Sequence, residues 1–188
     1  LELKRPLHVN VEKLIEKKKK KEGVTLEKGV STLITLLARG SFRDALSHLE
    51  KVLRISKDNH IALSEAQVVV GAPARELVFA CAAALAAHDA DTALNQLSTA
   101  IKNNADIDLF YELLTGHVRL ALLYGAAPTL RSEIEQEIDT DQLESVKKLA
   151  ELKLSENVLL KLIEAKTLMR YASPSYIPLE LACISICK

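Results

Sequence analysis

Apolar residues recur three and four positions apart along most of the 188-residue chain, which is the pattern of amphipathic α-helices. In the first 72 residues these stripes predict a helix over about 10–21, two more helices on either side of Gly40, and a short fourth helix that ends at Gly71. Thr25 and Ser64 stand before the second and fourth of these helices and are the expected N-caps. Helices this short, with matching apolar stripes, form one small bundle.

Beyond residue 73 the helices become longer. The pattern predicts helices at 74–88, 90–103, 106–124, 128–138, 140–153, 155–171 and 176–187. Asp89, Asp106 and Ser155 precede three of them as N-caps. Ala72 and Pro73 form a break between the two regions, so the sequence predicts two domains, residues 1–72 and 73–188.

Composition favours an all-α fold, because 48% of the residues are apolar while the chain holds only 6 glycines, 5 prolines and no tryptophan. The net charge is zero, but residues 1–67 carry 14 basic against 9 acidic side chains and residues 68–188 carry 11 against 16. No apolar stretch is long enough to span a bilayer and no secretory pattern opens the chain, so we expect a cytoplasmic protein without a membrane partner.

Two local features have more than one interpretation. The run Lys17 to Lys21 favours either a solvated helix end or a contact with a DNA backbone. Cys183 and Cys187 share a helix face at metal-ligand spacing, but no second Cys or His pair accompanies them, so we expect buried cysteines and no metal site. The alanine-rich stretch 80–87 predicts a helix–helix interface, inside the domain or between subunits.

The stretch Gly40 to Leu46, Gly-Ser-Phe-Arg-Asp-Ala-Leu, holds the clearest candidate for chemistry. Gly40 is suited to the left-handed turn that ends one helix, Ser41 to the N-cap of the next, and Asp44 to the return half of a capping box. Arg43 then lies in the first helical turn, beside free backbone N–H groups, where a phosphate suits both the guanidinium and the helix dipole. The alternative is a solvated surface arginine.

This stretch resembles the second sensor motif in the lid of AAA+ clamp loaders, and most closely that of the gamma/tau subunits of bacterial DNA polymerase III. The resemblance extends over the chain: Leu1 to Leu7 resembles the entry into the lid, Glu22 to Val24 the end of its first helix, Val68 to Gly71 its closing turn, and Pro178 to Ala182 a helix near the end of the collar. Glu50-Lys51 departs from the acidic-Gln pair of the family, and the stretch 80–87 is unusually rich in alanine.

The resemblance implies an AAA+ lid over residues 1–72 and a helical collar, an oligomerisation domain, over 73–188. Arg43 would contact the terminal phosphate of ATP, with Phe42 touching the nucleotide. The family's phosphate loop and Mg-binding motif belong to an ATPase domain that would precede Leu1, and this chain has no phosphate loop. We therefore expect a fragment with no catalytic residues and no tightly bound cofactor.

The partners implied are gamma/tau copies, delta and delta-prime subunits through the collar, an accessory-subunit peptide, and the sliding clamp and primed DNA through the complete loader. Such a subunit belongs to the DNA polymerase III holoenzyme, a nucleotidyltransferase complex of DNA replication. Two other interpretations stay open. The chain could be the lid and collar of another AAA+ clamp loader, or a helical adaptor in which Arg43 has no nucleotide role.

Overall fold

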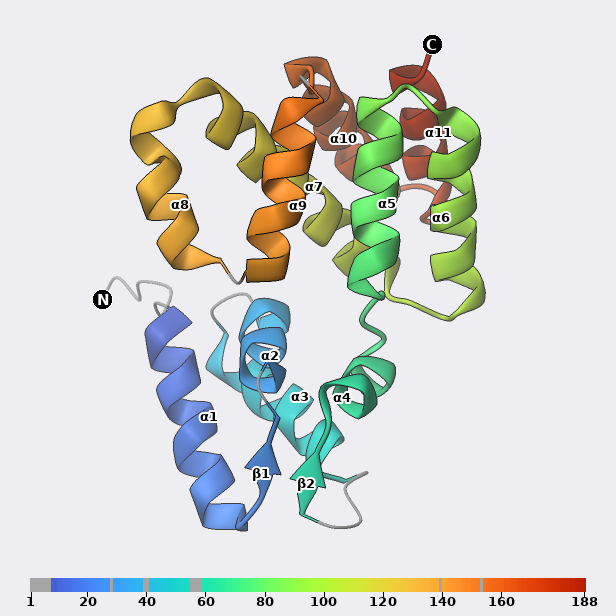
Figure 1. Cartoon of the computed structure of the whole chain (residues 1–188). Helices are drawn as coiled ribbons and strands as arrows, with labels where there is room; N and C mark the ends of the chain where they lie inside the picture. The colour runs from blue at the N-terminus through green and yellow to red at the C-terminus, as the bar shows by residue number, and fades with distance from the viewer. Residues whose placement is uncertain (1–7, 28, 39–40, 55–58, 139, 153) are drawn as a thin grey trace, which may run out of the picture. The chain divides into compact units, whose positions relative to one another are not determined.

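The computed structural model describes residues 8–27, 29–38, 41–54, 59–138, 140–152 and 154–188. They form two compact units, Leu1–Ala72 and Pro73–Lys188. Each unit consists mainly of helices (Figure 1), which confirms the predicted all-α fold, a small helical bundle followed by a larger helical unit. The identification of these units as lid and collar remains a prediction.

The first unit is a bundle of α1 (His8–Glu22), α2 (Val30–Ala38), α3 (Phe42–Leu53) and α4 (Leu63–Val70). The apolar stripes of these helices meet in one core, formed by Val11, Ile15, Val30, Ile34, Ala38, Ala45, Leu49, Val52, Ile61 and Ala66. Gly23 and Gly71 follow α1 and α4 with φ of 67° and 66°, the left-handed conformation that ends a helix. The predicted ends of these two helices are therefore confirmed.

A short parallel strand pair, which the sequence did not predict, joins the two halves of this bundle. It pairs β1 (Thr25–Leu26) with β2 (His60–Ile61). Thr25 is consequently a strand residue and not a helix N-cap. Ser64 is not a cap either, because α4 begins one residue earlier, at Leu63.

Two carboxylates cap α4 in place of Ser64. The Glu65 carboxylate accepts from the backbone N–H of Ala62 at 3.1 Å, and the Glu27 carboxylate accepts from that of Leu63 at 2.6 Å. Because Glu27 directly follows β1, this cap depends on a contact between segments 36 residues apart, which helical periodicity cannot reveal.

The second unit contains the helices α5 (Arg75–Ala86), α6 (Ala90–Lys102), α7 (Ile107–Ala126), α8 (Arg131–Glu137), α9 (Thr140–Glu151), α10 (Glu156–Met169) and α11 (Ile177–Ile186), with a 3₁₀ turn, η1 (Pro128–Leu130), before α8. All seven predicted helices of this region are confirmed, each with ends shifted by a few residues at most. Asp89, Asp106 and Ser155 each accept a hydrogen bond from a backbone N–H in the first turn of the helix they precede, as predicted.

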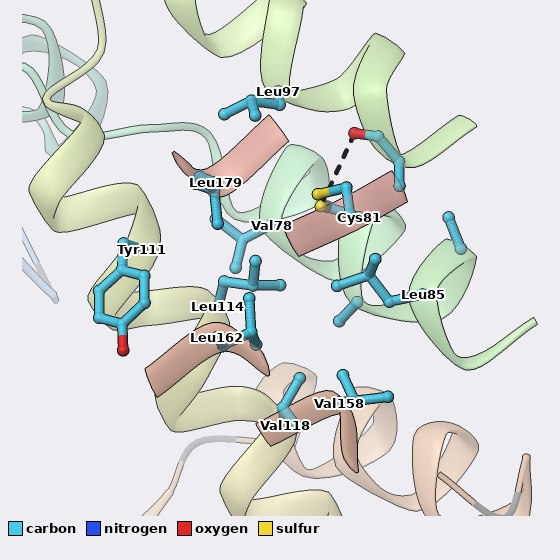
Figure 2. Close-up of a cluster of buried hydrophobic side chains, with 14 of the residues drawn as sticks. Val78, Cys81, Leu85, Leu97, Tyr111, Leu114, Val118, Val158, Leu162 and Leu179 are labelled. Carbon is cyan, nitrogen blue, oxygen red and sulfur yellow. Dashed lines mark hydrogen bonds between the residues drawn. The ribbon is translucent and has the colours of Figure 1, made fainter. Parts of the chain in front are cut away.

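The core of the second unit gathers side chains from α5, α6, α7, α9, α10 and α11. Figure 2 shows Val78, Leu114 and Leu162 pointing toward one another from three of these helices, with Tyr111 at the edge of the cluster and its hydroxyl directed away from it. These side chains lie on helices that the apolar periodicity predicted.

The cysteines are free thiols: Cys183 is buried as expected, whereas Cys187, also expected to be buried, is only partly so, because it is the C-cap of the last helix. Cys81 and Cys183 lie in the core, where the contact with the Cys183 thiol, together with burial, raises the pKa of the Cys81 thiol well above its usual value. The S–H of Cys81 donates to the carbonyl of Ala93 at 3.8 Å (Figure 2). Within the described residues, no group of three or more His, Cys, Asp or Glu side chains is arranged to hold a metal ion.

Among the helices described, none is by itself long and apolar enough to cross a membrane; α4 and α5 reach that length and composition only when they are counted together.

Candidate nucleotide-sensing and assembly sites

The N-terminus of α3 has an ordered cap. The Ser41 hydroxyl accepts from the backbone N–H of Asp44 at 3.2 Å, and the Ser41 carbonyl accepts from that of Ala45 at 3.0 Å. Ser41 is thus the predicted N-cap. The capping box predicts that the Asp44 carboxylate accepts a hydrogen bond from the Ser41 N–H. That N–H instead donates to the carbonyl of Ala38, at 2.7 Å. The predicted left-handed turn at Gly40 lies outside the described residues.

Arg43 and Phe42 occupy the first turn of this helix. The helix buries Ala45, Leu49 and Val52, and Arg43 lies on the opposite side with an exposed side chain. Phe42 is 43% exposed, at the border of the buried stripe. The first i→i−4 bond of the helix is made by Ala45, so the N–H groups of residues 42 and 43 precede it at the positive end of the helix dipole. This helix end suits an anion, while the ATP contact of Arg43 remains a prediction.

The second unit has a strongly apolar surface on its last two helices, which we call the α10–α11 face. On α10, Leu160, Ile163 and Leu168 are 55%, 50% and 56% exposed, and on α11, Leu181 is 58% exposed. Tyr171, Ile177 and Ile184 add further exposed apolar surface to the same segment. Leu168 and Leu181 face a groove of about 160 Å³ between the two helices.

These seven large apolar side chains do not all lie on one side of the two helices. Leu168 and Leu181 line the groove between α10 and α11, whereas Ile184 lines a groove with Leu94 of α6. Exposed leucine and isoleucine side chains in this number are the chemistry of a surface that a protein partner covers, so the segment is a candidate for assembly.

A second concave surface lies between α5 and α9, with a volume of about 470 Å³. Its apolar lining includes Phe79, Ala80, Ala83, Leu149 and Leu152. The alanine-rich stretch 80–87 thus has two sides: Ala82 and Ala84 are buried in the unit's own core, whereas Ala80 and Ala83 line the open groove. The helix–helix interface predicted for this stretch is confirmed inside the unit.

His117, to which the sequence assigned no role, lies buried on α7 behind this groove. Its ring stacks on Phe79, with centroids 4.2 Å apart, and its Nε2 lies 2.9 Å from the Ser145 hydroxyl. Burial, with a smaller contribution from the charge of Arg75, lowers the pKa of His117 from 6.5 to about 4. The only sequence signal was its position three residues after Leu114, on the apolar side of α7.

This buried histidine predicts a pH-dependent stability. Because the folded pKa lies below the unfolded value, the unfolded chain binds a proton that the folded chain does not, and stability falls as the pH drops from 6.5 toward 4. Replacement of His117 by phenylalanine should remove about 2.5 kcal/mol of the stability change between pH 7.5 and 4.5. Denaturant unfolding of both proteins at the two pH values measures this difference, and equal pH dependence would contradict it.

The comparisons with known proteins support the fold alone. The structure of the Bacillus subtilis DNA clamp loader delta protein (YqeN) is similar to this chain with a TM-score of 0.51 and 16% sequence identity. The match covers 100% of this chain but only 58% of that protein, so this chain spans less than two thirds of its neighbour's length. No family model and no curated protein sequence matches the chain.

Proposed function

We propose that this chain is the lid and collar of a clamp-loader subunit that assembles with related subunits and couples ATP to the loading of a sliding clamp on primed DNA. The observation that carries the proposal is the structural likeness to a clamp-loader protein along the entire chain, through both helical units. The sensor-like sequence around Arg43 was identified independently of that likeness.

The gamma/tau type is proposed from particular residues. Arg43 is exposed in the first turn of a helix whose cap is formed by Ser41, as a phosphate contact requires. In this proposal the nucleotide is held mainly by an ATPase domain outside the chain, which would also supply the magnesium site. Arg43 then makes the contact from the lid, with Phe42 beside the nucleotide.

Assembly is proposed to use the second unit, since Leu160, Leu168 and Leu181 on the α10–α11 face are each more than half exposed. The proposed partners on this unit are further copies of the subunit, delta and delta-prime subunits, and an accessory-subunit peptide. Because the structural neighbour is a delta protein, the second candidate is a clamp-loader subunit of another type, in which Arg43 does not contact ATP.

Clamp loading by the reconstituted loader tests the proposal. The full-length protein is combined with the delta and delta-prime subunits and the clamp of the same organism, and clamps on primed DNA are counted with and without ATP. ATP-dependent loading that needs this protein supports the proposal. Loading that is unchanged when the protein is omitted overturns it.

A further inference from the structure

The lysines of α1 differ in their exposure to solvent. Lys13, Lys17, Lys20 and Lys21 are exposed, whereas Lys18 and Lys19 are half-buried. The opposite side of α1 is fixed by Val11 and Ile15, which are fully buried in the core of the first unit. The lysines of α1 therefore form two sets, an exposed outer set and a half-buried inner set.

Ion pairs separate the two sets further. The ammonium of Lys18 lies 3.2 Å from the Glu22 carboxylate, and that of Lys19 lies 3.3 Å from the carboxylate of Glu16. Both inner lysines are therefore compensated on their own helix. Among the described side chains, no ion pair is formed by Lys13, Lys17, Lys20 or Lys21, which we call the α1 basic face.

The basic face has a regular geometry. Lys13, Lys17 and Lys20 follow one another at intervals of four and three residues, so they lie along one side of the helix. At 1.5 Å per residue this row extends about 10 Å, and Lys21 broadens it by a quarter of a turn. Flexible ammonium groups in such a row match a run of backbone phosphates, to which they contribute charge without reading sequence.

From this geometry we infer that the α1 basic face binds the phosphate backbone of a nucleic-acid duplex. The face carries no aromatic side chain on which an unpaired base would stack, which favours a duplex over a single strand. An anionic membrane fits less well, because the buried Val11 and Ile15 leave the helix without an apolar side to insert. The choice of DNA as the natural duplex rests on the proposed function, whereas backbone binding rests on α1 alone.

Two matched double variants test this surface. K17Q/K20Q removes two lysines of the basic face, and K18Q/K19Q removes the same charge from the same helix at the compensated positions. Glutamine and lysine have similar helix propensities, so both variants should keep the helix, which circular dichroism verifies. Binding to a fluorescent 20-base-pair DNA duplex is followed by anisotropy between about 50 and 200 mM salt, with no nucleotide present.

We expect K17Q/K20Q to weaken binding at least about tenfold at the lowest salt and to reduce the slope of log K against log salt by about 1.8, since each phosphate contact contributes about 0.9. K18Q/K19Q should change the slope by less than half as much. Equal losses in the two variants would mean a general charge effect and would overturn the assignment, as would a wild-type chain that does not bind the duplex.

Vesicles of phosphatidylserine and phosphatidylcholine serve as the second probe. Binding to these vesicles, but not to the duplex, with the same sensitivity to K17Q/K20Q would overturn the nucleic-acid assignment in favour of a membrane surface. Because the assay contains neither ATP nor other loader subunits, its failure is distinct from a failure of the sensor or assembly roles proposed above.

Discussion

Replacement of Arg43 by alanine is expected to reduce ATP-dependent clamp loading by the full-length protein about 10- to 150-fold. The estimate follows from the contribution of a charge-assisted phosphate contact, about 1.5–3 kcal/mol, at 1.4 kcal/mol per factor of ten. The free energy of unfolding should change by less than about 0.5 kcal/mol, because the side chain is exposed on the side of α3 opposite its buried stripe. Loading assays and denaturant unfolding measure the two quantities.

Two controls make this result specific. Arg43→Lys keeps the charge but loses the guanidinium fork, so we expect an intermediate loss. Arg54→Ala removes another exposed cation, from the C-terminal end of the same helix, and loading should remain normal. Normal loading by Arg43→Ala would favour a clamp-loader subunit in which this arginine has no nucleotide role, and unfolding of Arg43→Ala would show that the residue is structural.

The double substitution Leu160→Asp and Leu181→Asp is expected to abolish assembly of the second unit, with a loss of affinity greater than 100-fold. Both leucines are more than half exposed on the α10–α11 face, and burying an uncompensated carboxylate at an interface costs several kcal/mol per site. Because neither side chain belongs to the core, the variant should remain folded. Light scattering of wild-type and variant mixtures gives the change in assembly.

The matched control for the face is Leu130→Asp. Leu130 lies on the turn before α8 and is 37% exposed, so it tests an exposed leucine of the same unit outside the face. Assembly by this control should match the wild type. If the double variant assembles as well as the wild type while both fold normally, the α10–α11 face is not the assembly surface.

The helices, and in the first unit the sides that they bury, were predictable because they depend on local patterns. The spacing of Ala45, Leu49 and Val52 identifies the buried side of α3 directly from sequence, and Asp106 identifies the start of α7 by its capping chemistry. The helical end at Gly71 follows from the conformational freedom of glycine.

Features that depend on distant segments were not predictable. The strand pair at Thr25 and His60 and the capping of α4 by Glu27 join segments more than 30 residues apart, which no local pattern encodes. The groove that Phe79 lines and the burial of His117 likewise depend on the packing of α5, α7 and α9. The ion pairs of Lys18 with Glu22 and of Lys19 with Glu16 also become visible only in the side-chain geometry. They leave the lysines of the α1 basic face without an ion pair among the described side chains.

The candidate sensor was located by sequence resemblance and its helix cap by residue type, whereas the candidate assembly face required the structure. Arg43 belongs to a short contiguous motif, so its position at a helix start could be predicted. The exposed residues of α10 and α11 read as ordinary core leucines and isoleucines until the packing of the unit shows which of them remain outside the core.

The mass of this chain in solution, measured by light scattering alone and after mixing with the delta and delta-prime subunits of the same organism, tests the clamp-loader assignment most directly. We predict that the wild-type chain forms a complex of defined mass with both partners. The Leu160→Asp, Leu181→Asp variant should not form this complex. A chain that keeps the mass of a single copy and binds neither partner would contradict the assignment.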